Sequence, residues 1–211
     1  MFLGAAVGAL TGGSALFVAR YFIDVYQATP KRTWTQRQRV LTILGATIFG
    51  GSLAWAANDL LTFLAVMIFF FLLLILTLVD FAVRRIPNKL ILALLIWAAI
   101  QISVFGQPSI RAALLGLLAN GFFMLIIAIV GRGAMGMGDV KLEAALGAVL
   151  GFPLGLYALF WGIMFGGLAA LLLLVSRRAS LKSSFAYGPY LALGGLLIYL
   201  SLFQLSPWPS F

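Results

Sequence analysis

The sequence predicts an all-α integral membrane protein, a polytopic helical bundle of about eight transmembrane helices. Two observations indicate this fold class. Of the 211 residues, 64% are hydrophobic and only 9% are charged, which is far more apolar than an ordinary soluble domain. The apolar residues also form long continuous runs, whereas a β-barrel would show short alternating strands. We therefore expect one membrane domain over residues 1–211, surrounded by the lipid bilayer.

The first half of the chain contains four apolar runs. No basic segment precedes the first run, so we expect a retained span and not a cleavable signal. A polar linker over residues 20–39, interrupted by Pro30, separates it from the second run. The third run is the most hydrophobic and ends at Asp80. The four expected spans cover about residues 2–19, 40–57, 60–78 and 90–105. The glycines that predict close helix packing in the first span are Gly4, Gly8, Gly12 and Gly13.

Four further runs follow a turn at Gly106–Ser109. The sixth run has only about fourteen residues before Pro153, which is short for a full crossing. Pro189 suits the first turn of the eighth helix. An aromatic interfacial tail is expected over residues 206–211. The four expected spans cover about residues 110–130, 139–152, 154–175 and 188–204.

The distribution of basic residues predicts the topology of these spans. All of the 14 Lys and Arg residues except Arg111 fall in or beside the linkers after the first, third, fifth and seventh spans. Cytoplasmic loops carry such an excess of basic residues, so these linkers are predicted to be cytoplasmic and both termini to face outward. The net charge of +9 therefore reflects membrane topology, and we do not expect a nucleic-acid partner.

The residue inventory limits the possible chemistry. The chain has no cysteine and no histidine, which excludes disulfides, thiol catalysis and zinc sites built from these residues. Only five acidic residues are present. We expect no metal and no cofactor.

The segment Gly131–Leu146 stands out because it places four glycines just ahead of or beside Asp139 at the edge of a span. An ionisable residue at membrane depth is costly and suggests a functional site. The predicted topology puts Asp80 and Asp139 at the same cytoplasmic face. Two carboxyl groups sharing a site can hold one proton between them, so that one activates water and the other polarises a peptide carbonyl. Gly136 and Gly138 would let an extended substrate lie against the backbone.

These residues resemble a known family. Gly136-Met137-Gly138-Asp139 is similar to the GxGD signature of membrane aspartic proteases, and its continuation through Leu142 resembles the type IV prepilin leader peptidases. Asp80 followed by Arg84-Arg85-Ile86-Pro87-Asn88 resembles the first aspartate of that family with its Ile-Pro-Asn loop. The segment from Phe185 to Gly194 resembles the start of the family's last span.

The resemblance implies a bacterial inner-membrane endopeptidase with a prepilin or pilin-like substrate. Such enzymes remove a short basic leader at the cytoplasmic face, after a glycine that precedes an apolar helix. Asp80 and Asp139 would then be the catalytic pair. The residues expected to bind substrate or shape the site are Gly136, Gly138, Pro87, Asn88, Lys141 and Glu143.

The chain departs from many family members in its first linker. Those proteins carry a cytoplasmic insertion with paired Cys-x-x-Cys zinc ligands and also methylate the new pilin N-terminus. Here the linker over residues 20–39 is short and contains no cysteine, so we do not expect methyltransferase activity. The oligomeric state is left open.

Simpler interpretations of single residues remain open. Asp139 is also placed to cap a helix N-terminus, and Asp80 to end a helix at the headgroup level. Asn120 is expected to form an interhelical hydrogen bond. Glu143 follows Asp139 by four residues on the same helical face, where it could raise the pKa of Asp139 or help to hold a cation. We expect it instead to face water or to pair with a Lys or Arg. Arg84, Arg85 and Lys89 are interpreted as topology determinants.

Two other functions compete with the peptidase. A proton- or cation-coupled transporter would use Asp80 and Asp139 as relay groups, but it predicts internal repeats and acidic residues near the midplane. We find no convincing repeat in the sequence. A catalytically silent scaffold for pilin-like subunits would not need either carboxyl group.

Overall fold

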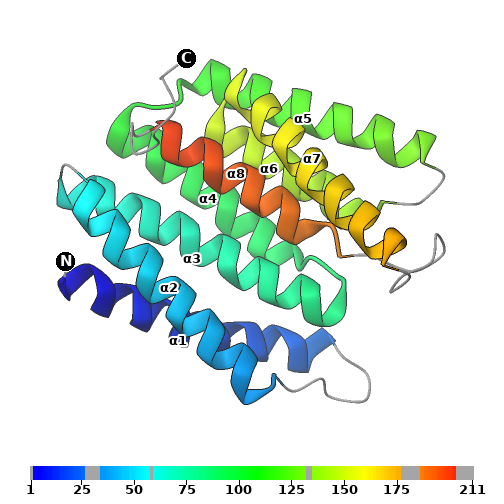
Figure 1. Ribbon diagram of the computed structural model, residues 1–211. Coiled ribbons are helices and arrows are strands. Elements are labelled where there is room, and N and C mark those ends of the chain that lie inside the picture. Colours follow the sequence, from blue (N-terminus) through cyan, green and yellow to red (C-terminus); the bar gives the residue numbers. More distant parts are fainter. Residues whose placement is uncertain (1, 27–33, 58, 132–134, 177–185, 203–211) are drawn as a thin grey trace. The chain divides into compact units, whose positions relative to one another are not determined.

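The computed structural model describes residues 2–26, 34–57, 59–131, 135–176 and 186–202, and within these ranges every element is an α-helix (Figure 1). Six of the helices are long and apolar enough to cross a membrane, which confirms the polytopic helical fold class. The helices are α1 Phe2–Tyr26, α2 Gln36–Ala56, α3 Leu60–Val83, α4 Asn88–Phe105, α5 Ile110–Val130, α6 Met137–Leu150, α7 Leu154–Val175 and α8 Gly188–Leu202. The two that fall short of a full span are α6 and α8.

The predicted helix boundaries agree best with the observed ones where turn residues mark the end of a helix. Helices α5 and α7 begin and end at the predicted residues. The first span was predicted to stop at about residue 19, but α1 continues to Tyr26. The helix continues through its charged residues because Arg20 and Asp24, four residues apart, form an ion pair on its surface. The distance between Arg20 Nε and Asp24 Oδ2 is 3.9 Å. Likewise α3 continues to Val83, so Asp80 lies inside the helix and not after it.

Several predictions fall outside the described residues. These are the break at Pro30, the positions of Lys31, Arg32 and Arg132, the basic segment over residues 177–185, and the aromatic tail. The assignment of linkers to the cytoplasmic side also stays a prediction.

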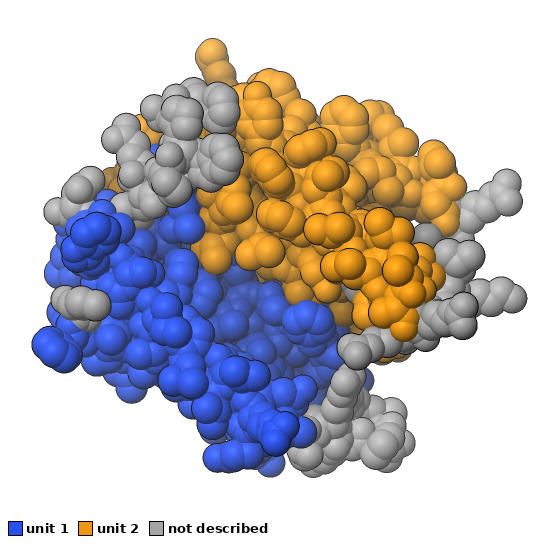
Figure 2. All heavy atoms as spheres, viewed as in Figure 1, with its two compact units in different colours: residues 1–83, 200–211 blue, residues 84–199 orange. Residues whose placement is uncertain are grey.

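The chain divides into two compact units, residues 1–83 with 200–211 and residues 84–199 (Figure 2). We describe each unit by itself. The expectation of a single domain over residues 1–211 therefore stays a prediction.

In the first unit α1 packs against α2 and α3. A Cβ atom on Gly8 would collide with the backbone of Ala46, and one on Gly12 would lie 3.0 Å from the Cβ atom of Ala46. The predicted close packing through the glycines of α1 is confirmed for Gly4, Gly8 and Gly12. It is wrong for Gly13, because a Cβ atom there would have no neighbour within 4 Å.

In the second unit α6 packs against α4, α5 and α7. Its side chains from Val140 onward are buried except that of Lys141 and the partly exposed Ala144. Helices α5 and α6 approach through a pair of glycines, because a Cβ atom on either Gly116 or Gly147 would collide with the backbone of the other. Helix α6 is thus enclosed by protein on several sides.

Candidate functional site

Asp80 lies in the last turn of α3, in the first unit. The preceding residues of α3 belong to the most apolar of the described helices. The Asp80 side chain is 4% exposed. A carboxyl group placed so deeply at the end of an apolar helix is an expensive arrangement, which supports a functional interpretation.

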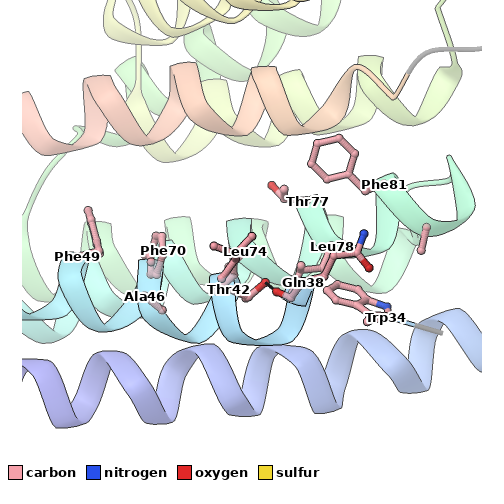
Figure 3. Close-up of a pocket in the computed structure, with 13 residues that line it drawn as sticks. Trp34, Gln38, Thr42, Ala46, Phe49, Phe70, Leu74, Thr77, Leu78 and Phe81 are labelled. Atoms are coloured by element: carbon pink, nitrogen blue, oxygen red, sulfur yellow. Dashed lines mark hydrogen bonds between the residues drawn. The ribbon is translucent and has the colours of Figure 1, made fainter. Parts of the chain in front are cut away.

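A groove of about 690 Å³ runs between α2 and α3 within this unit (Figure 3). Phe49 and Phe70 stack at one end of the groove, with ring centroids 4.2 Å apart. Trp34 and Phe81 lie toward the other end, where Gln38, Thr42 and Thr77 add polar groups (Figure 3). Asp80 is on the same turn of α3 as Phe81 but is not part of the lining. The groove therefore becomes more polar toward the end of α3 that carries Asp80.

Asp139 is the third residue of α6, in the second unit. Its Oδ2 atom accepts a hydrogen bond from the backbone N–H of Gly136 at 3.2 Å. Gly136 is the residue that precedes the helix, so the prediction that Asp139 caps this N-terminus is confirmed. The side chain is partly exposed, which leaves it accessible as well as fixed.

The segment that links α3 to α4 contacts the first turn of α6. A Cβ atom on Gly138 would lie 3.2 Å from the Cβ atom of Ile86, so the missing side chain allows this segment to approach. Lys141 Nζ donates a hydrogen bond to Asn88 Oδ1 at 3.1 Å. Pro87 is buried and immediately precedes α4. These residues all belong to the second unit, and within it the Ile-Pro-Asn part of the first motif meets the second motif at the start of α6.

Glu143 does not face water, and within the part of the chain that the structure describes no basic side chain pairs with it. It is 0% exposed, and its Oε2 atom accepts a hydrogen bond from Asn120 Nδ2 at 3.0 Å. The prediction that Glu143 faces water or pairs with a basic residue was wrong, because α4, α5 and α7 pack against α6. Asp139 and Glu143 share a helical face, but this face is buried at Glu143, one turn after Asp139. The predicted interhelical hydrogen bond of Asn120 is confirmed, and Nδ2 also donates to the Gly155 carbonyl at 2.8 Å.

The remaining acidic residues lie at exposed positions. Asp59 precedes α3 and accepts hydrogen bonds from the Thr62 backbone N–H at 2.7 Å and from the Thr62 hydroxyl at 2.8 Å. These bonds hold the pKa of Asp59 below its ordinary value. Asp24 is beside Arg20 on the surface of α1. Among the described residues no three acidic side chains gather as metal ligands would.

Comparison with known proteins identifies the family. The family model of the type IV leader peptidase family matches residues 67–171, about half of the chain, and this range includes both motif aspartates. The chain belongs to the type IV leader peptidase family. The match begins in α3 and ends in α7, so it leaves out the Phe185–Gly194 resemblance.

Curated proteins similar to this chain support the same family assignment. The prepilin leader peptidase/N-methyltransferase of Bacillus subtilis (strain 168) is 31% identical over 133 residues, which cover 63% of this chain and 54% of that protein. The protein of the same name from Pectobacterium carotovorum subsp. carotovorum is 32% identical over 152 residues, 69% of this chain and 51% of that protein. The one from Pseudomonas putida is 27% identical over 186 residues, 83% of this chain and 64% of that protein. The chain thus spans between about half and just under two thirds of the length of these relatives. No solved structure matches the chain.

Gln101 was not singled out from the sequence. It is fully buried in α4, and its Nε2 atom donates to the carbonyls of Val149 at 3.2 Å and Gln107 at 3.1 Å. The sequence did carry a signal for Gln101, because an amide side chain inside an apolar transmembrane helix needs a hydrogen-bond partner on a neighbouring helix. Gln101 fixes the C-terminal end of α6, far along the helix from Asp139.

Proposed function

We propose that the protein is an aspartic endopeptidase that removes short basic leaders from prepilins or pilin-like secretion proteins. It acts at the cytoplasmic face of the bacterial inner membrane and cleaves after a glycine that precedes the substrate's apolar helix. Membership of the leader peptidase family and the names of the relatives support this activity.

The observation that carries the proposal is the contact between the two motif segments. Ile86 and Asn88, which follow Asp80 in the chain, contact Gly138 and Lys141, which surround Asp139. Lys141 and Asn88 are 53 positions apart in the chain, so the hydrogen bond between them depends on how the helices of this unit pack and not on local sequence. No comparable observation favours a transporter.

In the proposed reaction Asp80 and Asp139 act on one peptide bond. One carboxylate takes a proton from a water molecule, whose oxygen attacks the carbonyl carbon of the glycine. The other carboxyl group donates its proton to the carbonyl oxygen. The tetrahedral intermediate then collapses, the C–N bond breaks, and the departing amine takes up a proton. Asp139 is held for this step by its hydrogen bond to Gly136.

We propose peptidase activity alone, without N-methylation. The relatives are named for both activities, but the linker over residues 20–39 contains none of the cysteines of the zinc-binding insertion. No cofactor is required for the hydrolysis as proposed.

The test is cleavage of a synthetic prepilin that carries a basic leader, a glycine and about twenty apolar residues, with the purified protein in liposomes. We expect Asp80→Asn and Asp139→Asn each to lower the rate by roughly 10²–10⁴-fold. Asp59→Asn and Asp24→Asn are matched controls, since both residues are exposed acids on the same protein. Normal cleavage by a folded Asp80→Asn or Asp139→Asn protein contradicts the proposal, as does a similar loss in the two controls.

A further inference from the structure

Asn120 and Glu143 form a buried polar bridge across three helices. Asn120 is on α5, Glu143 is on α6, and both side chains are 0% exposed. Asn120 Nδ2 donates one hydrogen bond to Glu143 Oε2 at 3.0 Å and another to the carbonyl of Gly155 at 2.8 Å, at the start of α7. A single amide group thus connects all three helices.

The backbones around this bridge are packed as closely as the atoms allow. A Cβ atom on Gly155 would lie 2.9 Å from Asn120 Oδ1 and 3.0 Å from the Cα atom of Gly147. The second oxygens of the bridge, Glu143 Oε1 and Asn120 Oδ1, are buried without a hydrogen-bond partner among the described residues. An apolar pair of similar volume would fill this space at lower cost. The cost of the bridge suggests a role other than stability.

The position of Glu143 on α6 connects the bridge to the proposed site. Glu143 follows Asp139 by one helical turn, on the same face. A helix with side chains has a radius of about 5–6 Å, so a rotation of roughly 20° about the axis would move the Asp139 carboxylate by about 2 Å. A misplacement of about 1 Å can cost a catalytic group roughly 10²-fold. Apolar contacts bring the helices close but are not directional, whereas a hydrogen bond in an apolar interior is directional and strong.

We propose that Glu143 and Asn120 are positioning residues that fix the rotational setting of α6 and thereby aim Asp139 at the substrate. This inference rests on the proposed peptidase function. The contact of Asp139 with Gly136 is local to the first turn and moves with the helix, so it does not fix this rotation. The bridge between Asn120 and Glu143 does fix the rotation, because it joins α6 to two neighbouring helices.

Three variants separate positioning from stability and from chemistry. Glu143→Gln keeps an oxygen that can accept from Asn120 and removes the charge. Glu143→Leu breaks the bridge from one side. The double variant Glu143→Leu/Asn120→Leu replaces both polar groups with apolar ones, which restores stability when no buried group is left unpaired. Gln101→Leu is the matched control, because it removes another buried interhelical bond to α6, at its far end.

The first measurement is cleavage of the synthetic prepilin, with kcat and KM determined separately and the melting temperature recorded for each variant. We expect Glu143→Gln to keep kcat within about 3-fold of the unmodified protein. The double variant should melt at the unmodified protein's temperature and yet lose roughly 10–100-fold in kcat, with KM little changed. Gln101→Leu should lower the melting temperature without such a loss in kcat. A stable double variant with normal kcat overturns the inference, and so does a folded Glu143→Gln protein without activity, which would make Glu143 a participant in the chemistry.

The second measurement does not depend on activity. The chain has no cysteine, so spin labels can be placed at Val130→Cys and Met137→Cys, positions 75% and 58% exposed at the end of α5 and the start of α6. We expect pulsed electron resonance to give a narrow distance distribution that broadens or shifts in the double variant and is unchanged in Glu143→Gln. An identical distribution in all three proteins overturns the positioning role. Absence of cleavage by the unmodified protein would contradict the proposed function instead, and the distance measurement would still test the bridge.

Discussion

Replacing Gly147 with alanine adds one methyl group at the closest approach of α5 and α6. The Cβ atom would lie 2.6 Å from the carbonyl carbon of Gly116 and 3.0 Å from the Cβ atom of Asn120. Ordinary carbon–carbon contacts are about 3.5–4 Å, so the helices must separate by roughly 1 Å. The obstructing atoms are mainly backbone, and no flexible side chain can move away to make room.

The expected loss of stability follows from two opposing effects. Overpacking of this kind costs about 1–3 kcal/mol, and the rigid backbone contact favours the upper end. Alanine recovers about 1 kcal/mol because it is the better helix former. The net loss of about 2 kcal/mol corresponds to a melting temperature about 4–8 °C lower for a chain of this size.

The assay is thermal unfolding in one detergent, with Gly167→Ala as the control. Gly167 is also helical, but a Cβ atom there would have no neighbour within 4 Å. Only the propensity effect then remains, so the control should melt at the same temperature as the unmodified protein or about 2–4 °C above it. Equal melting temperatures for Gly147→Ala and Gly167→Ala would refute the close helix contact.

Three further changes test other contacts. Tyr199→Phe removes the hydroxyl that accepts from Trp97 Nε1 at 3.2 Å in the buried part of the second unit, so we expect a loss of about 1–2 kcal/mol and a melting temperature about 2–8 °C lower in the same assay. Arg84 has a φ of 53°, where a side chain costs about 1–2 kcal/mol, and the larger entropy loss of glycine on folding offsets about 0.5–1 kcal/mol of this. The net gain of about 1 kcal/mol should raise the melting temperature of Arg84→Gly by about 2–4 °C, and a decrease would contradict the strain. The pKa of Asp59 is lowered by its bonds to Thr62, so its contribution is present above its unfolded pKa of about 3.9 and is lost as pH falls through the lower folded value. Asp59→Asn should therefore melt below the unmodified protein at pH 7 and at the same temperature in strong acid, and a difference independent of pH would contradict this.

Long apolar runs and turn residues were enough to predict the helices. The bounds of α5 and α7 follow from Ser109 and Pro153, which mark where each helix can begin. The end of α1 could not be read in the same way. The apolar run stops at Arg20, so the boundary of the span was predicted there. A helix can continue through charged residues on its surface, and α1 ends only six residues later, at Tyr26.

The motif residues of the candidate site were predicted, but their contacts were not. Helical spacing showed that Asp139 and Glu143 share a face, and it did not show what that face meets. Gly138 was expected to make room for substrate, and in the structure Ile86 lies against it. Such pairings depend on which helices become neighbours, and neither residue carries that information alone.

The surroundings of α6 explain why Glu143 was placed wrongly. With 14 residues the helix is about 21 Å long, shorter than the roughly 30 Å hydrocarbon core. The sequence predicted a short sixth span and, separately, a Glu143 that faces water or pairs with a Lys or Arg. Instead α4, α5 and α7 pack against it, so Glu143 Oε2 accepts its hydrogen bond from a protein group, Asn120, and not from solvent. Non-lipid surroundings of this kind are what permit a carboxyl group at membrane depth, and they also explain how Asp139 can be held at the start of the same helix.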